Sequence, residues 1–305
     1  MLFRSGSERW LESHAGESAT HKDNLSRGMY PTETPLDRAE LCLSCHLGTK
    51  DRYATHEIMA AGHPRLQFEL EGFTATQPAH FTVDADYEER KGKIEGTNLW
   101  VTGQIENART QLRLLQTSMY ATNSMFPELA FYDCDACHHP MDNVRWNQER
   151  ASMGIKPGAL RLQMHSLLMV QAIVSSFDPA GAAELARLTN GLVRAGMQDR
   201  ATVGAAAKNV LAWLNQRTDL SRRKYSRAET VNLRKALIKY GASEKGGDYQ
   251  TASQIYMGVD SLSTTLGDRD AKKANLDTLF KLIDKPSAFS PARFMGTAKN
   301  LQNEF

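Results

Sequence analysis

The chain has 305 residues, and its 37 Lys and Arg side chains nearly balance 35 Asp and Glu side chains, for a formal charge of +2. Hydrophobic residues make up 41% and charged residues 24% of the sequence, which excludes an intrinsically disordered protein. The balance of charge excludes nucleic-acid binding driven by bulk positive charge, and no apolar run is long enough for a transmembrane helix.

Residues 1–40 are polar and contain several turn signals, and a short helix is expected to begin near Asp37. This helix carries Cys42, Cys45 and His46 in the pattern C-x-x-C-H, which is the attachment motif of c-type haem. Two thiols one helical turn apart can each form a thioether with a vinyl group of the porphyrin. The histidine that follows can then bind the iron.

Residues 47–98 contain many Gly, Pro and charged residues and little hydrophobic periodicity, so by themselves they predict a long loop. Chain wrapped around a large apolar plate such as porphyrin gains burial without regular structure, which fits this composition. Residues 99–121 predict a helix, because apolar residues recur three or four positions apart. The expected stripe consists of Ile105, Ala108, Leu112, Leu115 and Met119.

A second copy of the motif contains Cys134, Cys137 and His138. The two C-x-x-C pairs leave two alternatives open, a zinc ion held by four thiolates and a redox-active dithiol or disulfide. Neither alternative accounts for a histidine directly after both pairs. We therefore predict haem c at each motif, with all four cysteines as thioethers and with His46 and His138 as the proximal iron ligands.

After about residue 155 the pattern changes to one helix after another, which predicts an all-α array of helical hairpins. Helices are expected near 249–266 and 270–284, among others. The boundary signals are an N-cap and first-turn proline at Asp178-Pro179, a capping box at Ser226 and Glu229, a C-cap at Gly241, and a start at Ser290-Pro291.

The histidines are distributed unevenly, because eight of the nine lie in the first 139 residues. A six-coordinate haem iron needs a second axial ligand, usually His or Met. We favour His63 for this role, because Gly62 allows close backbone approach and Pro64 restrains the turn.

The other histidines rank lower as distal or neighbouring-haem ligands. His14 is the second candidate, and His56, His80 and His139 are weaker ones, for which a hydrogen-bonding role is the alternative. We expect no ligand role for His21 and His165.

Several segments occur in an order that is typical of one known family. They are Trp10–His14, Asp37–Gly48, His56–Leu70, Pro78–Phe81 and Tyr132–His139. In these segments, over about residues 6–146, the chain resembles the multihaem c-type cytochromes of the cytochrome c-554 type, which contain a cytochrome c-552/4 domain.

The resemblance implies an exported electron-transfer protein with closely packed haems that are bound mostly by pairs of histidines. It places His46 and His138 as proximal ligands. Four further histidines fall where the family has its other histidines, namely His14, His56, His63 and His80.

The family also has an export signal and further C-x-x-C-H motifs upstream, one of them usually just before the segment that corresponds to Gly6–Trp10. Here that position is Met1–Ser5, which contains neither a cysteine nor the apolar stretch of a signal peptide. We therefore expect an N-terminally truncated chain, and more haems in a full-length protein.

Together these patterns predict a mainly α protein, with an irregular haem-wrapped multihaem cytochrome domain over 1–150 and an all-helical scaffold or docking domain over 151–305. The predicted function is electron transfer with redox partner proteins, in the periplasm or otherwise outside the cytoplasm, by an electron carrier rather than a catalyst. One alternative is a multihaem oxidoreductase that acts on a small nitrogen or sulfur compound at an open iron. Another is a zinc-stabilised helical interaction module.

Overall fold

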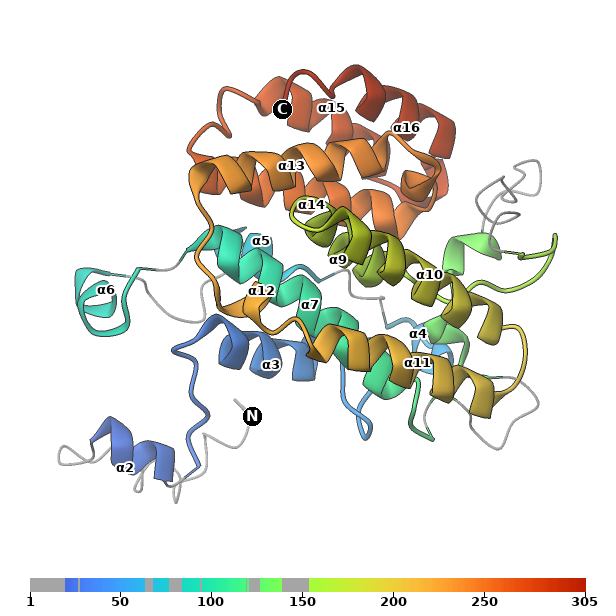
Figure 1. Ribbon diagram of the computed structural model, residues 1–305, viewed down its shortest axis with the longest axis horizontal. Coiled ribbons are helices and arrows are strands. Elements are labelled where there is room, and N and C mark those ends of the chain that lie inside the picture. The colour runs from blue at the N-terminus through green and yellow to red at the C-terminus, as the bar shows by residue number, and fades with distance from the viewer. Residues whose placement is uncertain are drawn as a thin grey trace.

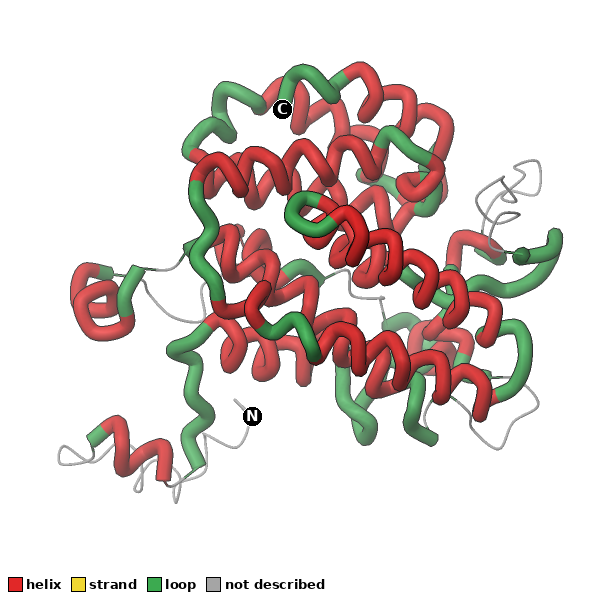
Figure 2. The backbone as a smooth tube through the Cα atoms, viewed as in Figure 1, coloured by secondary structure: helices red, strands yellow, loops and turns green. Residues whose placement is uncertain are grey.

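The computed structural model describes residues 20–26, 28–63, 68–76, 84–93, 95–118, 120, 127–138 and 154–305. Helices dominate these residues, and Figure 2 shows them joined by loops with no strand in the described part of the chain. The prediction of a mainly α protein is confirmed. Among the described helices, none combines the length and the apolar composition that crossing a bilayer requires.

The first part of the chain contains more helices than the sequence predicted. The helix that carries the first motif begins at Pro35, close to the expected start, with Thr34 as its N-cap. The expectation of a long loop over 47–98 is wrong, because three short helices interrupt it, two of them behind capping side chains. The helices here are α2 (His21–Ser26), α3 (Pro35–His46), α4 (His56–Ala60), α5 (Leu70–Thr76), α6 (Ala85–Lys91) and α7 (Gly96–Leu114).

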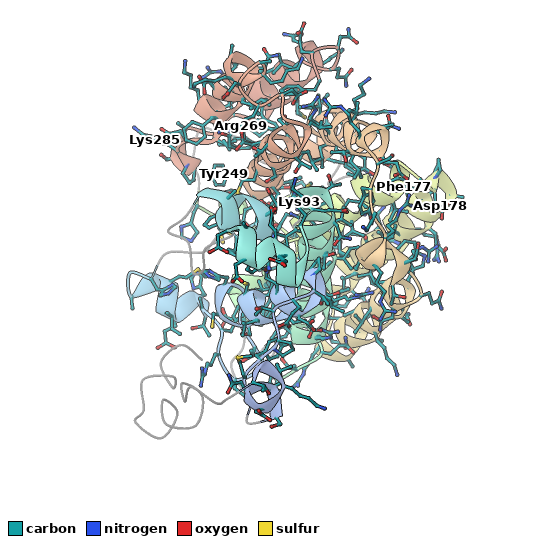
Figure 3. All side chains as sticks on the ribbon, turned by 90° about the vertical axis from the view of Figure 1, so that its left-hand side faces the viewer. Lys93, Phe177, Asp178, Tyr249, Arg269 and Lys285 are labelled. Carbon is teal, nitrogen blue, oxygen red and sulfur yellow. The ribbon has the colours of Figure 1, made fainter. Side chains whose placement is uncertain are left out.

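Over residues 154–305 the predicted helix boundaries are largely confirmed. Asp178 accepts the backbone N–H of Gly181 at 2.8 Å and caps a helix that begins at Pro179; Figure 3 labels Asp178 beside Phe177 at this turn. The helices are α9 (His165–Ser175), α10 (Pro179–Ala195), α11 (Arg200–Asn215), α12 (Asp219–Arg222), α13 (Arg227–Gly241), α14 (Tyr249–Leu266), α15 (Lys273–Ile283) and α16 (Pro291–Asn300).

The cap at the start of α13 forms as predicted, since the Ser226 side chain accepts the N–H of Glu229 and the Glu229 carboxylate accepts the N–H of Ser226. Gly241 is the last residue of α13 instead of its C-cap, which is Ala242. A side chain at Gly241 would begin 3.3 Å from the ring of Phe294 on α16, so its small size serves helix packing.

Helix α7 is the centre of the molecule, and 15 of its 19 residues are buried. It packs against α3, α5, α9, α11, α12 and α14, and Figure 1 shows it in the middle of these helices. The apolar stripe is confirmed for Ile105, Ala108, Leu112 and Leu115, whereas Met119 lies outside the described residues. The helix ends before the predicted residue 121, because the chain turns after Leu114.

Because α7 is surrounded, its polar residues are buried too and find partners on other helices. The Gln104 amide donates to Gln254 at 3.1 Å, and Arg109 donates to the carbonyl of Leu214 at 3.0 Å. The main hydrophobic cluster runs from Trp100 to Phe305 and so includes both parts of the chain. The predicted boundary at residue 150 lies outside the described residues.

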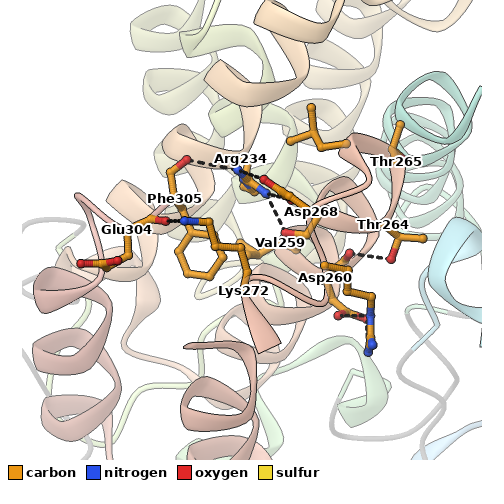
Figure 4. Close-up of polar contacts among 12 residues, drawn as sticks. Arg234, Val259, Asp260, Thr264, Thr265, Asp268, Lys272, Glu304 and Phe305 are labelled. Atoms are coloured by element: carbon orange, nitrogen blue, oxygen red, sulfur yellow. Dashed lines mark hydrogen bonds and ion pairs between the residues drawn. The ribbon is translucent and has the colours of Figure 1, made fainter. Parts of the chain in front are cut away.

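The end of the chain is fastened to the helical part by Arg234 of α13 (Figure 4). This guanidinium donates to both carboxylate oxygens of Asp268, at 2.6 and 2.9 Å, and to the Phe305 carbonyl at 3.3 Å. Hydrogen bonds from Arg234 lower the pKa of Asp268, although partial burial acts in the opposite direction. The bidentate ion pair therefore joins α13 to the turn after α14, and the hydrogen bond to Phe305 brings the last residue to the same arginine.

Two carboxylates lie buried where α5 meets α14. Glu69 is 1% exposed; it accepts the N–H groups of Glu71 and Gly72 at 2.8 and 2.6 Å and the hydroxyl of Ser261 at 3.1 Å. Burial raises the pKa of Glu69 from 4.5 to about 7 despite these hydrogen bonds, and burial also raises the pKa of Glu71. The folded protein therefore favours the neutral form of Glu69 below about pH 7, and burial acts on Glu71 in the same direction.

We predict that Glu69→Gln stabilises the protein above pH 7 and has little effect near pH 5. The folded state binds the Glu69 proton more tightly than the unfolded chain, so stability is lost as the pH rises through about 7. Shifting the pKa from 4.5 to about 7 corresponds to a loss of up to about 3 kcal/mol.

Urea unfolding of both proteins at pH 5 and pH 8 measures this effect. The exposed Glu57 provides the control, since Glu57→Gln should follow the wild type at both pH values. An equal pH dependence in wild type and Glu69→Gln would contradict the prediction.

Candidate functional site

The first motif occupies the last two turns of α3. Because α3 packs on α7, its buried side chain Leu43 joins a small cluster with Ala39, Phe68, Leu70 and Leu99. Cys42 packs against this cluster, and burial raises the pKa of its thiol although Arg38 acts in the opposite direction. Cys45 is exposed, and the His46 ring stacks on Phe68 with centroids 4.2 Å apart.

The chain leaves α3 through a turn that requires a glycine. Gly48 has a φ of +119°, and a side chain there would begin 2.5 Å from the Arg52 carbonyl oxygen. Thr49 and Arg52 pair across the turn, with the N–H of Thr49 donating to the Arg52 carbonyl at 2.7 Å. The turn brings Tyr53 onto Phe131, where the rings stack with centroids 4.7 Å apart. The loop after the first motif is therefore packed against the residues just before the second.

The second motif forms a tighter turn than the first. Cys134–Ala136 is a single 3₁₀ turn, and the N–H groups of Cys137 and His138 both donate to the Cys134 carbonyl, at 3.1 and 2.7 Å. Asp133 caps the turn by accepting the N–H of Asp135. Cys134 is half-buried, whereas Cys137 and His138 are exposed.

A buried ion triad fastens the second motif to the helical part of the chain. Arg161 contacts the carboxylates of Asp133 at 3.2 Å and Asp248 at 3.0 Å, and all three residues are buried. Burial alone would raise the pKa of Asp248, but Arg161 and hydrogen bonds from Thr251 lower it. Asp248 also caps α14, so the triad links the motif to the start of that helix.

Backbone pairing next to the triad fixes the register of the same segment. Tyr132 and Leu162 form an antiparallel bridge, in which the N–H of Asp133 donates to the Arg161 carbonyl at 2.9 Å. On the other side, the N–H of Gln163 donates to the Phe131 carbonyl at 2.8 Å. Residues 161–163 therefore hold the strand-like segment that precedes Cys134.

The structure brings His56 next to His138, with ring centroids 6.2 Å apart and ring planes inclined by 36°. Glu128 positions His56, because its carboxylate accepts the N–H groups of His56 at 2.7 Å and Ala130 at 2.9 Å. Two imidazoles that bind one metal through nitrogen atoms about 2 Å away have ring centres about 6 Å apart. The inclination of the planes is compatible with such a pair, since each ring can rotate about its metal–nitrogen bond.

A cavity of about 440 Å³ lies beside the first motif. Such a volume is within the usual range for sites that hold cofactors or small ligands. The motif side of the cavity contains Cys45 and His46, and the loop that follows adds Arg52, Met59 and His63. Five further lining residues come from or next to α7, α9 and α14, namely Asn107, Gln111, His165, Gln250 and Gln254.

The residues of both motifs fit the chemistry of haem attachment. All four cysteines are free thiols, as thioether formation requires. Among the described residues, no three His, Cys, Asp or Glu side chains converge as a metal site. The two C-x-x-C pairs are thus separate, which suits two attachment sites and gives no support to one zinc ion bound by all four thiolates.

Of the other predicted ligands, the structure places His63 at the cavity and His56 beside His138. His63 is exposed in the turn after α4, where Gly62 has a φ of +107°. Three predicted candidates, His14, His80 and His139, lie outside the described residues and stay predictions. Sequence analysis assigned no role to His165, although an imidazole at the start of an otherwise apolar helix is an unusual core residue.

We predict that Arg161→Met destabilises the protein by about 3–5 kcal/mol, because it leaves two buried carboxylates without a cation. The matched control is Lys273→Met, which removes an exposed pair with Asp277 and should change stability by about 1 kcal/mol or less. Urea unfolding of both variants measures the difference. Equal stabilities of the two variants would show that the triad does not hold the second motif.

Comparison with known proteins adds no relative, since no protein-family model, no curated protein and no solved structure matches this chain.

Proposed function

We propose that this protein transfers electrons through haem c groups bound covalently at its two C-x-x-C-H motifs. The observation that carries the proposal is the pairing of His138 with His56, at the spacing of two imidazoles that share a metal ion. Cys42 and Cys45 would hold one haem and Cys134 and Cys137 the other, with His46 and His138 as proximal ligands. When bound, each haem supplies an iron that cycles between Fe(III) and Fe(II).

The contacts around the motifs suit electron transfer, which needs ligands that stay in place in both oxidation states. Phe68 packs flat on the His46 ring, and Glu128 holds the backbone at His56. The ion triad of Asp133, Arg161 and Asp248 fixes the chain directly before Cys134. A pair of histidines at an iron also keeps its reduction potential below that of a Met/His pair.

The proposal includes a compartment and a class of partners. Haem attachment requires reduced thiols and the maturation machinery outside the cytoplasm, so we place the protein in the periplasm or an equivalent compartment. Its partners would be other redox proteins.

One observation favours a second function, an oxidoreductase that acts on a small nitrogen or sulfur compound. The cavity beside Cys45 and His46 has room for such a molecule next to the first iron. This function requires an iron with an open position. A high-spin iron that binds cyanide or nitric oxide would favour it, whereas two low-spin irons favour electron transfer.

We predict that wild-type protein matured in a competent bacterial host has the mass of the chain plus two haems. Cys45→Ser removes one thiol and should prevent double attachment at the first site, which changes the pyridine haemochrome spectrum. Ser44→Ala, at the neighbouring residue of the same turn, should keep the added mass of two haems and leave the spectrum unchanged. A wild-type mass equal to the bare polypeptide, with four titratable thiols, would overturn the proposed function.

We further predict that His56→Ala leaves both haems attached and converts one of two low-spin irons to high spin. The reason is that the cysteines are untouched while the imidazole beside His138 is lost. Electron paramagnetic resonance measures the spin state, and Glu57→Ala on the same helix is the control. A wholly low-spin spectrum of His56→Ala would contradict the pairing with His138.

A further inference from the structure

His165 lines the same cavity as Cys45 and His46 of the first motif, and it is the only histidine after residue 139. It comes from α9 in the helical part of the chain, whereas Cys45 and His46 come from α3. The cavity thus brings together an imidazole from each part of the chain.

We propose that His165 binds the iron of the first haem on the side opposite His46. This inference rests on the proposed function and adds to it a ligand from the helical part. It gives that part a role at the iron in addition to its role as a scaffold.

Burial distinguishes His165 from the other imidazole that lines the cavity beside His46. His165 is 8% exposed, whereas His63 is exposed in the turn after the five-residue helix α4. Of these two imidazoles, only His165 is therefore shielded from solvent, as the ligand of an enclosed haem iron would be.

The position of His165 is held firmly by its neighbours along the chain. Ser166 donates to the Gln111 side chain at 2.6 Å, which joins the start of α9 to α7. Directly before it, residues 161–163 are paired with the segment of the second motif and anchored by the buried Arg161. Ligands on helices are placed more reproducibly than ligands on loops, so this setting suits an axial ligand better than the His63 turn does.

The lining of the cavity also includes a hydrogen-bond acceptor of the kind that a metal-bound imidazole needs, in the side chain of Asn107. The Asn107 Oδ1 atom is buried and has no hydrogen-bond partner among the described residues. A histidine that binds metal through one ring nitrogen usually donates from the other nitrogen to such an acceptor. Gln254 of this lining is already committed, since it accepts from Gln104 and donates to the Phe68 carbonyl at 3.3 Å.

The test uses the full chain matured with haem, in wild type and in the variants His165→Ala, His165→Met and His63→Ala. We expect two low-spin irons in the wild type. His165→Ala should retain two haems by pyridine haemochrome assay while one iron becomes high spin, and added imidazole should restore the low-spin signal. His63→Ala should leave both irons low spin.

His165→Met is the control for a folding defect, because methionine has a side-chain volume close to that of histidine and can itself bind haem iron. It should stay low spin and raise one of the two reduction potentials, since Met/His ligation gives higher potentials than a pair of histidines. Potentiometric titration followed by visible absorbance measures this change.

Three outcomes would overturn the inference. They are a wholly low-spin His165→Ala protein that still holds two haems, unchanged potentials in His165→Met, and a high-spin iron at the first site of the wild type. Each of these leaves covalent haem in place, so haem attachment at the two motifs would stand. The third outcome would favour the oxidoreductase over electron transfer. Absence of covalent haem from the wild type would instead remove the proposed function itself.

Discussion

The buried contact between Arg161 and the carboxylates of Asp133 and Asp248 is the constraint on which the arrangement of the site depends. Removing Arg161 leaves two carboxylates in the interior without their shared counter-charge, which is strongly unfavourable. The adjacent bridge between Tyr132 and Leu162 cannot shift by one residue without breaking the triad. The second motif is therefore fixed in register against the helical part, and with it Phe131, on which Tyr53 from the loop of the first motif stacks.

The central helix α7 explains how one interior accommodates both apolar packing and a polar cavity wall. A helix surrounded by other helices has no face exposed to solvent. Its side-chain amides and its Glu106–Arg109 ion pair must therefore find hydrogen-bond partners within the protein. Most of these groups bond to neighbouring helices. Asn107 instead lines the cavity, where the chain offers its carbonyl oxygen no partner among the described residues. An orphaned buried acceptor is costly, and a group in the cavity that donates a hydrogen bond offsets that cost.

The parts of the structure that sequence analysis predicted are those encoded locally. The caps at Asp178 and Ser226 are formed by residues three positions apart, and the C-x-x-C-H motifs are contiguous, so both are readable without a fold. The short helix α4 was missed because five residues give no periodicity, and only its Thr55 cap marks it. The proximity of His56 and His138 depends on Glu128, which bonds the start of α4 from 72 residues away. The place of His165 on the cavity likewise depends on how α7, α9 and α14 pack, and no local pattern encodes that.

The two motifs are built differently. On the proposed function this difference would affect electron transfer, because burial and nearby charge influence the reduction potential of a haem. At the first motif, His46 is half-buried under Phe68. Neutral amides and apolar groups make up most of the cavity lining beside it. Among the described residues, Arg52 is the only Lys, Arg, Asp or Glu side chain in that lining. At the second motif, His138 is exposed, and the buried charges of the triad begin at the residue before Cys134. Neutral dipoles therefore line the cavity beside the first motif, whereas the paired charges of Asp133 and Arg161 lie directly before the second. On the proposed function, two chemically identical attachment motifs would therefore hold irons in different electrostatic settings, and the difference comes from residues outside the motifs.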